Sequence, residues 1–174
     1  MEDFNIRKSN SGDIESIERL YPDAFPSEEL RPLVLALLRD TPQVLSLVAR
    51  AGPDLVGHVV MTPCRVSGLD VTVALLGPLA VATAWQRRGI GSRLIRAGFD
   101  ELQTAGYSHV FVLGDPAYYR RFGFQPERTV APPYPIPDEW RDAWQSRAIS
   151  GVEFSKSGSL IVPPAWNERA YWAG

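Results

Sequence analysis

The segment from Val71 to Leu113 constrains the fold more than any other part of the sequence. Val71–Val81 is apolar and predicts a strand, and the run Gln86–Gly91, rich in arginine and glycine, follows it. Residues 92–105 then place apolar side chains at helical spacing, and His109–Leu113 predicts a second strand. Strand, loop, helix and strand in this order form a βαβ crossover with parallel strands, so the loop lies at the carboxyl end of the first strand.

The rest of the sequence predicts further strands and helices, which together make the sheet mixed. We expect strands at residues 4–8, 44–50, 55–62, 151–154 and 160–162, and helices at 11–20 (capped by Ser11), 27–38 (starting after Ser27) and 138–147. Within the strand at 71–81, Gly77-Pro78 predicts a bulge or splay, because proline withholds a hydrogen-bond donor.

Composition limits the possible functions. A length of 174 residues with 45% hydrophobic residues suits one domain, and a net charge of -2 without a massed basic patch argues against a nucleic acid partner. The single cysteine, Cys64, cannot form an internal disulfide, and with only His58 and His109 beside it we expect no structural metal. The start Met1–Phe4 lacks a signal peptide pattern and no apolar stretch is long enough to span a bilayer, so we expect a cytoplasmic protein without a membrane partner.

The run Gln86–Gly91 has the chemistry of a diphosphate site. The start of a helix presents unpaired N–H groups and a partial positive charge, and Gly89 and Gly91 would let a phosphate come close. Arg87 and Arg88 add positive charge, and the Ser92 hydroxyl adds a donor. The alternative interpretation is a tight turn with two solvated arginines.

Two common nucleotide-binding motifs do not fit this run. A dinucleotide fingerprint would need glycine or alanine at position 94, which holds Leu94, and the Gly-Lys-Ser/Thr of a Walker loop is absent. The run therefore carries neither of these two motifs.

The chain resembles the GCN5-related N-acetyltransferase (GNAT) superfamily. Gln86, Gly89 and Gly91 match its signature Gln/Arg-x-x-Gly-x-Gly/Ala between a strand and a helix, and Tyr119–Phe124 matches the spacing Tyr-x-x-x-Gly-Phe of its second signature. The version Gly-Asp-Pro-x-Tyr-Tyr at residues 114–119 looks like that of the YhbS-like branch.

The resemblance implies a fold, an activity and partners. The expected fold class is α/β (α+β): a GNAT fold with a mixed, mostly antiparallel twisted sheet, a central parallel βαβ unit and helices on both faces. Residues 1–174 would form one acyltransferase domain, of which 125–174 are the divergent C-terminal part. It would use acetyl-CoA as cosubstrate, without a metal. It would act as a monomer or homodimer and transfer the acyl group directly to a primary amine of a small molecule or protein in a ternary complex.

The resemblance also implies roles for individual residues. The coenzyme would be bound by the end of the first strand, the loop and one tyrosine: Leu79, Ala80, Val81, Gln86, Arg87, Arg88, Gly89, Ile90, Gly91, Ser92 and Tyr119. The Val81 N–H would polarise the thioester carbonyl, which is the logic of an oxyanion hole. Tyr119 would act as general acid toward the departing thiolate, although the aromatic patch around it could also be simple packing.

The sequence leaves the general base and the acceptor open. His58 and Asp115 are the two candidates for the base, and each has an ordinary structural alternative, as a core histidine and as a turn or cap residue. Several aromatic residues could line an acceptor site or only anchor the tail: Tyr21, Phe25, Tyr134, Trp140, Trp144, Trp166 and Trp172. The same motifs would also suit a non-catalytic coenzyme A sensor or interaction module, or a transferase for hydroxyl acceptors or longer acyl groups.

Overall fold

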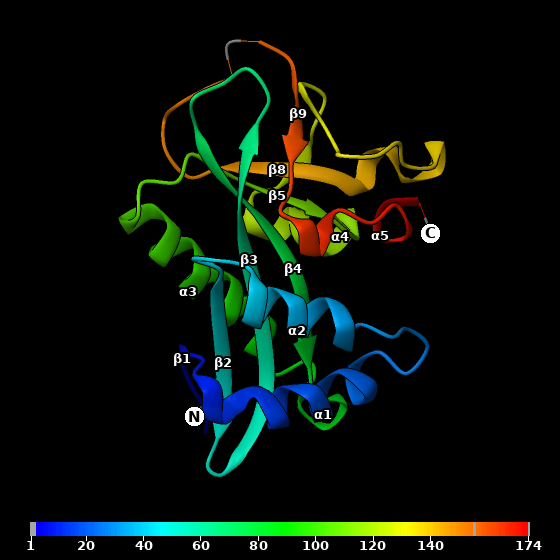
Figure 1. Cartoon of the computed structure of the whole chain (residues 1–174). Helices are drawn as coiled ribbons and strands as arrows, with labels where there is room; N and C mark the ends of the chain where they lie inside the picture. The colour runs from blue at the N-terminus through cyan, green and yellow to red at the C-terminus, as the bar shows by residue number, and fades with distance from the viewer. Residues whose placement is uncertain (1–2, 155, 174) are drawn as a thin grey trace. The chain divides into compact units, whose positions relative to one another are not determined.

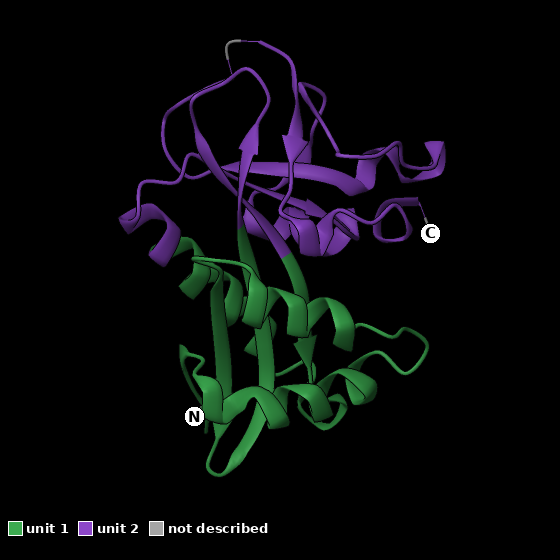
Figure 2. Ribbon diagram, viewed as in Figure 1, with its two compact units in different colours: residues 1–62, 77–100 green, residues 63–76, 101–174 purple. Residues whose placement is uncertain are grey.

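The computed structural model of the chain describes residues 3–154 and 156–173, and it divides the chain into two compact units (Figure 2). Unit 1 comprises residues 1–62 and 77–100, and unit 2 comprises residues 63–76 and 101–174. Three elements continue from one unit into the other: strand β3 (Asp54–Val66), strand β4 (Thr72–Val81) and helix α3 (Ile90–Thr104).

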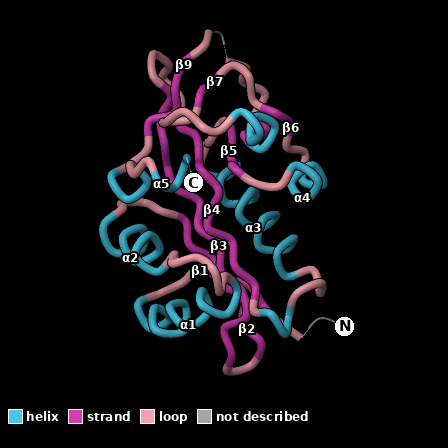
Figure 3. Tube along the Cα trace, turned by 90° about the vertical axis from the view of Figure 1, so that its right-hand side faces the viewer, coloured by secondary structure: helices cyan, strands magenta, loops and turns pink. Residues whose placement is uncertain are grey.

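Unit 1 has an antiparallel sheet with helices on both faces. Strand β1 (Asn5–Lys8) pairs with β2 (Leu45–Ala51), and β2 pairs with β3 across the turn at Gly52, where φ is +59°. Helices α1 (Ile14–Ala24) and α2 (Arg31–Asp40) lie on one face of these strands and the first part of α3 lies on the other (Figures 1 and 3).

The two faces of the unit 1 sheet are packed differently. The core under α1 and α2 consists of large apolar side chains and one alanine: Ile17, Leu20, Tyr21, Val34, Val48 and Ala80. Under α3, glycines let helix and strand come close. A Cβ on Gly57 would lie 2.8 Å from Ile90 Cγ2, and one on Gly98 would lie 2.4 Å from Met61 Cε. The absence of side chains at these two glycines thus allows the short distance between α3 and β3.

Unit 2 contains the parallel pairing that the βαβ pattern predicts. The first part of β4 pairs parallel with β5 (His109–Leu113), through Ala74 with Val110 and Leu75 with Phe111. Two residues after Leu75, Gly77 adopts φ +139°, which fits the irregularity predicted for Gly77-Pro78. The mixed sheet and the parallel βαβ unit are therefore confirmed.

The remaining strands of unit 2 are short and antiparallel, apart from one parallel bridge. β5 pairs with β8 (Trp144–Ala148), and β8 pairs with β6 (Gln125–Pro126). The end of β3 pairs with β9 (Gly158–Ile161), to which β7 (Val130–Ala131) adds in parallel. Helix α4 (Pro116–Tyr119) and the 3-10 turn η3 (Arg120–Phe122) lie between β5 and β6, and η4 (Asp138–Ala143) lies between β7 and β8. Two short helices follow β9: η5 (Pro164–Trp166) and α5 (Ala170–Ala173).

Some sequence predictions were wrong about element type. The helix expected at 138–147 is the 3-10 helix η4 followed by strand β8, because pairing with β5 overrides the local helical preference. Residues 151–154, all of which the structure describes, form no strand, and Phe154 instead stacks on His109 with ring centroids 4.0 Å apart.

Two predicted helix starts were displaced. Asn10, not Ser11, caps the turn that leads into α1: its side chain accepts from the Gly12 N–H at 2.9 Å. Helix α2 starts at Arg31 rather than just after Ser27, with Pro32 in its first turn, where proline is tolerated. Glu29 lies before the helix and pairs with the Arg31 guanidinium at 2.6 Å.

Candidate functional site

The loop between β4 and α3 has the backbone shape of an anion-binding turn. After the 3-10 turn η2 (Thr83–Trp85), Arg87 and Gly89 both adopt left-handed conformations, with φ of +65° and +83°. A Cβ on Gly89 would meet no atom within 4 Å, so the position opens onto free space. Glycine here is explained by its φ and not by crowding.

Helix α3 presents unpaired donors at its start. The Arg93 N–H donates to the Gly89 carbonyl oxygen at 3.1 Å, so the N–H groups of Ile90, Gly91 and Ser92 precede the first hydrogen bond of the helix. These donors, the partial positive charge of the helix end and the open space at Gly89 fit the diphosphate of a coenzyme A molecule.

The two arginines of the loop are exposed and near this helix start. The Arg88 guanidinium carbon lies 4.8 Å from the centre of the Trp85 ring, an arrangement that steadies the side chain without neutralising its charge. Arg87 is exposed as well. Both cations therefore remain available to phosphate oxygens.

The end of β4 alternates in burial just before the loop. Ala80 is buried in the core with Tyr21, whereas Leu79 and Val81 are half-buried and face the other side of the strand. The Val81 carbonyl accepts from the Gln86 side-chain amide at 3.2 Å. Gln86, a residue of the predicted signature, thus links the loop to the last residue of β4.

Tyr119 lies in unit 2, at the end of α4. Its ring lies against Gly114, on which a Cβ would be only 2.5 Å from Tyr119 Cε2, and it also contacts the rings of Tyr118 and Phe124. Burial, with smaller contributions from Tyr118 and Asp115, raises the pKa of Tyr119 well above its usual range. The phenol is therefore neutral and able to donate a proton.

Asp115 starts the short helix that carries Tyr119. Its carboxylate accepts the Ala117 N–H at 3.0 Å, and its side chain is exposed. The cap interpretation of this residue is thus confirmed, and the exposed carboxylate stays close enough to Tyr119 to raise the pKa of the phenol.

His58 is enclosed in unit 1. Its side chain is fully buried, with Nδ1 2.8 Å from the Tyr21 hydroxyl and Nε2 2.8 Å from the Ser46 hydroxyl. Burial lowers the pKa of the imidazole to about 3. Both ring nitrogens are engaged, as expected of a structural histidine.

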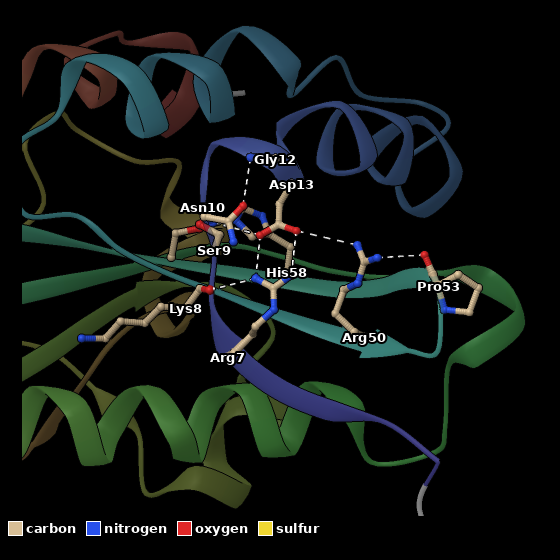
Figure 4. Close-up of polar contacts among 10 residues, drawn as sticks. Arg7, Lys8, Ser9, Asn10, Gly12, Asp13, Arg50, Pro53 and His58 are labelled. Carbon is tan, nitrogen blue, oxygen red and sulfur yellow. Dashed lines mark hydrogen bonds and ion pairs between the residues drawn. The ribbon is translucent and has the colours of Figure 1, made fainter.

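A buried carboxylate lies close to His58 (Figure 4). Asp13 is 3% exposed and receives two hydrogen bonds from the Arg7 guanidinium, at 2.7 and 2.9 Å, while Arg50 lies 3.7 Å away. The Arg7 hydrogen bonds hold the pKa of Asp13 below its usual range. This cluster joins β1, β2 and the turn before α1. Sequence reasoning missed it, because Arg7 and Asp13 meet only through the turn between them and Arg50 reaches them only through the pairing of β1 with β2.

The aromatic residues considered for an acceptor site are mostly packing residues. Tyr21, Trp144 and Trp172 are each at most 2% exposed and lie in the two cores. Trp166 packs against Trp172 with ring centroids 5.9 Å apart, and the Tyr134 hydroxyl donates to the Asn167 side chain at 2.9 Å. These contacts favour the interpretation that the aromatic residues anchor the C-terminal segment.

The described parts of the chain show neither a metal cluster nor a membrane span. No group of three or more His, Cys, Asp or Glu side chains in residues 3–154 and 156–173 is arranged to hold a metal ion. Within the same ranges, no helix combines the length and the apolar character needed to cross a membrane.

Comparisons with known proteins agree with this geometry. A family model described as the acetyltransferase (GNAT) family matches residues 14–124. An uncharacterized N-acetyltransferase of Escherichia coli K12, YjhQ, is 36% identical over 160 residues, which cover 88% of this chain and 87% of that protein.

Two crystal structures are similar over nearly the whole chain. One is the E. coli GNAT family N-acetyltransferase YhbS in complex with CoA, with a TM-score of 0.84, 26% identity and coverage of 97% of this chain and 94% of the other. The second is a GNAT family acetyltransferase from Brucella melitensis in complex with acetyl-CoA, with a TM-score of 0.75, 29% identity and coverage of 94% and 98%.

Proposed function

Because the chain belongs to the GNAT family of acetyltransferases, we propose that it transfers an acetyl group from acetyl-CoA directly to a primary amine of a small molecule or protein. The observation that carries this proposal is the start of α3. Three unpaired N–H groups, on Ile90, Gly91 and Ser92, follow an open left-handed glycine and two exposed arginines. This arrangement suits the diphosphate of coenzyme A.

The remaining residues of the loop and strand would orient the donor. Leu79 and Val81, on the half-buried side of β4, would lie along the pantetheine arm, and Gln86 would keep the strand end and the loop in register. The Val81 N–H would donate to the thioester carbonyl oxygen, where negative charge develops as the amine attacks. Relatives crystallised with CoA and acetyl-CoA support this choice of donor.

Tyr119 would supply the proton that the reaction needs at sulfur. The amine nitrogen forms a bond to the carbonyl carbon, the carbon–sulfur bond breaks, and the thiolate takes the phenolic proton of Tyr119. Since burial keeps this phenol neutral, it holds its proton throughout the neutral pH range. The proton lost by the amine balances the one that Tyr119 gives up.

We assign the base role to Asp115, acting through water, and not to His58. Asp115 is exposed beside Tyr119, whereas His58 is fully buried and both its nitrogens are hydrogen-bonded to Tyr21 and Ser46. A proton accepted by His58 would be isolated from solvent, and its low pKa disfavours the charged form.

The proposal is tested by coenzyme binding in a matched pair of glycine variants. Gly89→Ala forces a side chain into φ +83°, and Gly106→Ala does the same at φ +87°, both with free space around the new Cβ. The cost in backbone conformation is thus similar, about 1 to 2 kcal/mol. Only Gly89→Ala should weaken CoA binding, by about tenfold in calorimetry. Equal affinities in the two variants would remove the loop from the coenzyme site.

Catalysis is tested by offering acetyl-CoA with a panel of primary amines and measuring release of the CoA thiol, with product masses as confirmation. Acetylated amines are the expected result. CoA binding without thiol release for any amine would instead favour the non-catalytic sensor, and acylated hydroxyl compounds would change the acceptor class.

Three broader expectations remain part of this proposal. They are a single acyltransferase domain with a divergent part at residues 125–174, a cytoplasmic location, and a monomeric or homodimeric state. Size-exclusion chromatography with light scattering measures the last of these.

A further inference from the structure

We propose that Asp23 is a positioning residue for the coenzyme loop, which it holds from helix α1. The proposal rests on the proposed function, because it takes the start of α3 as the diphosphate site. Asp23 lies in the last turn of α1, and Thr83 is the first residue of η2, the turn between β4 and the loop.

Two hydrogen bonds join these residues, which are far apart along the chain. The Thr83 N–H donates to Asp23 Oδ2 at 2.8 Å, and the Thr83 hydroxyl donates to the Asp23 backbone oxygen at 3.1 Å. The first bond involves an ionised acceptor, which makes it stronger than a bond between neutral groups.

Each bond satisfies a group that a helix end leaves without a partner. The Thr83 N–H opens η2, where the cap residue Ala82 supplies no side-chain acceptor. The Asp23 carbonyl lies in the last turn of α1, where carbonyls lack intrahelical donors. Asp23 and Thr83 therefore cap each other's helices, so the end of α1 and the start of η2 stabilise one another.

The loop needs such support because its backbone is unfavourable. Arg87 adopts φ +65° although it is not a glycine, and such conformations persist where surrounding contacts enforce them. The Ala82 N–H donates to the Val56 carbonyl at 2.8 Å and Gln86 bonds to Val81, so the segment is tied before Thr83 and after it. Asp23 adds a third tie, from helix α1, between these two.

Loss of this tie should change coenzyme binding more than the chemical step. With Thr83 released, residues 83–89 would populate other conformations, and binding would have to select the competent one. The apparent affinity for CoA should then fall by about fivefold, the size expected for one net hydrogen bond. Turnover with an acetyl donor that lacks a diphosphate should not change.

The variants are chosen to isolate the tie. Asp23→Ala removes the carboxylate, and Asp23→Asn keeps an oxygen that can accept the Thr83 N–H. Thr83→Pro removes both donors at a first helical position, where proline is favoured, and Ala82 already has the extended ψ of 138° that precedes proline. Glu15→Ala is the control, because it removes an exposed carboxylate from the same helix.

The measurements are the CoA dissociation constant by calorimetry, the melting temperature, and turnover with S-acetyl-N-acetylcysteamine, a thioester without a diphosphate, on the amine found by thiol release. We expect about fivefold weaker CoA binding for Asp23→Ala and Thr83→Pro, with no further loss when the two are combined. Asp23→Asn should bind CoA with an affinity between those of the wild type and Asp23→Ala, since its amide oxygen still accepts the Thr83 N–H but carries no charge. Glu15→Ala should bind as the wild type does, and turnover with the short thioester should be unchanged in all variants.

The outcomes separate this proposal from the proposed function. If Gly89→Ala weakens CoA binding while Asp23→Ala and Thr83→Pro do not, the loop is still the coenzyme site and the role proposed for Asp23 is wrong. Equal losses with CoA and with the short thioester would also overturn it, since they indicate general damage. If the wild type itself does not bind CoA, both proposals fail together.

Discussion

The imidazole of His58 is a neutral bridge between two hydroxyl groups. In a neutral ring one nitrogen donates and the other accepts, so the ring can satisfy Tyr21 on α1 and Ser46 on β2 together. Ser9 extends the chain by donating to the Ser46 hydroxyl at 2.7 Å. The residue therefore holds a helix and a strand in place, and its value to the protein depends on its remaining uncharged.

This predicts a specific loss of stability in acid. The folded imidazole has a pKa of about 3 and the unfolded one has the ordinary value of 6.5, so below pH 6.5 the unfolded state binds a proton that the folded state does not. The contribution is fully present above pH 6.5 and is lost as the pH falls toward 3. Between about pH 6 and pH 4.5, the free energy of unfolding should fall by up to about 1.4 kcal/mol per pH unit more steeply in the wild type than in His58→Gln.

Urea unfolding at a series of pH values measures this difference. Protonation of Asp13 also destabilises the protein in acid, because Arg7 lowers the pKa of this carboxylate. Since both proteins contain Asp13, its contribution is common to the two pH profiles. Parallel pH profiles would show that His58 is not the group responsible.

Tyr119 allows a prediction about catalysis at the same scale. Tyr119→Phe removes the proton donor and keeps the ring contacts with Gly114 and Phe124. Turnover should fall by about 100-fold while the dissociation constant of CoA changes little, because the role proposed for the hydroxyl is to protonate the departing sulfur. Steady-state kinetics and calorimetry on one preparation check both, and unchanged turnover would remove the acid role.

At the scale of elements, the sequence was most informative where its signals are local. The periodicity of α3, the strand at His109–Leu113 and the glycine loop were readable because each depends on neighbouring residues. β8 was misread because Trp144–Ala148 becomes a strand only through pairing with β5. The hydrogen bonds between Asp23 and Thr83 were missed for the same reason, because the residues around each of them in the sequence do not indicate the contact.

The packing of α3 on β3 predicts a cost for a small added side chain. Gly57→Ala would place a methyl group 2.8 Å from Ile90 Cγ2 and 3.0 Å from Leu94 Cδ1, and both partners are buried and cannot move aside easily. We expect a loss of about 1 to 3 kcal/mol in the free energy of unfolding. Gly151→Ala is the matched control, because its Cβ would meet no atom within 4 Å. Urea unfolding of both variants decides the matter, and equal midpoints would contradict the close packing.

At the scale of the whole molecule, the C-terminal residues are part of the core of unit 2. The family model ends at residue 124, but the described members of that core include residues beyond it: Val130, Trp144, Leu160 and Trp172. Trp172 is 1% exposed, and its indole N–H donates to the Trp166 carbonyl at 3.0 Å. The segment beyond residue 124 therefore completes the burial of residues that the family model matches, such as Phe111, whose ring centroid lies 5.4 Å from that of Trp144.

Trp172→Ala should accordingly destabilise the protein by about 3 to 5 kcal/mol, as is typical of a tryptophan removed from a core. Val152→Ala, at a side chain that is 47% exposed, should change stability by less than about 0.5 kcal/mol. Urea midpoints of the two variants give the comparison, and a small loss for Trp172→Ala would mean that α5 is only loosely attached.

The contact between Gly114 and Tyr119 has a consequence for how this site could be altered. The phenol ring occupies the volume that a side chain at position 114 would otherwise take, so a residue without a side chain determines where the hydroxyl points. As the neighbour of the proposed acid, position 114 would affect the reaction although it carries no reactive group. Enlarging it by one methyl group would displace the ring of the proposed acid while leaving every functional group of the protein in the sequence.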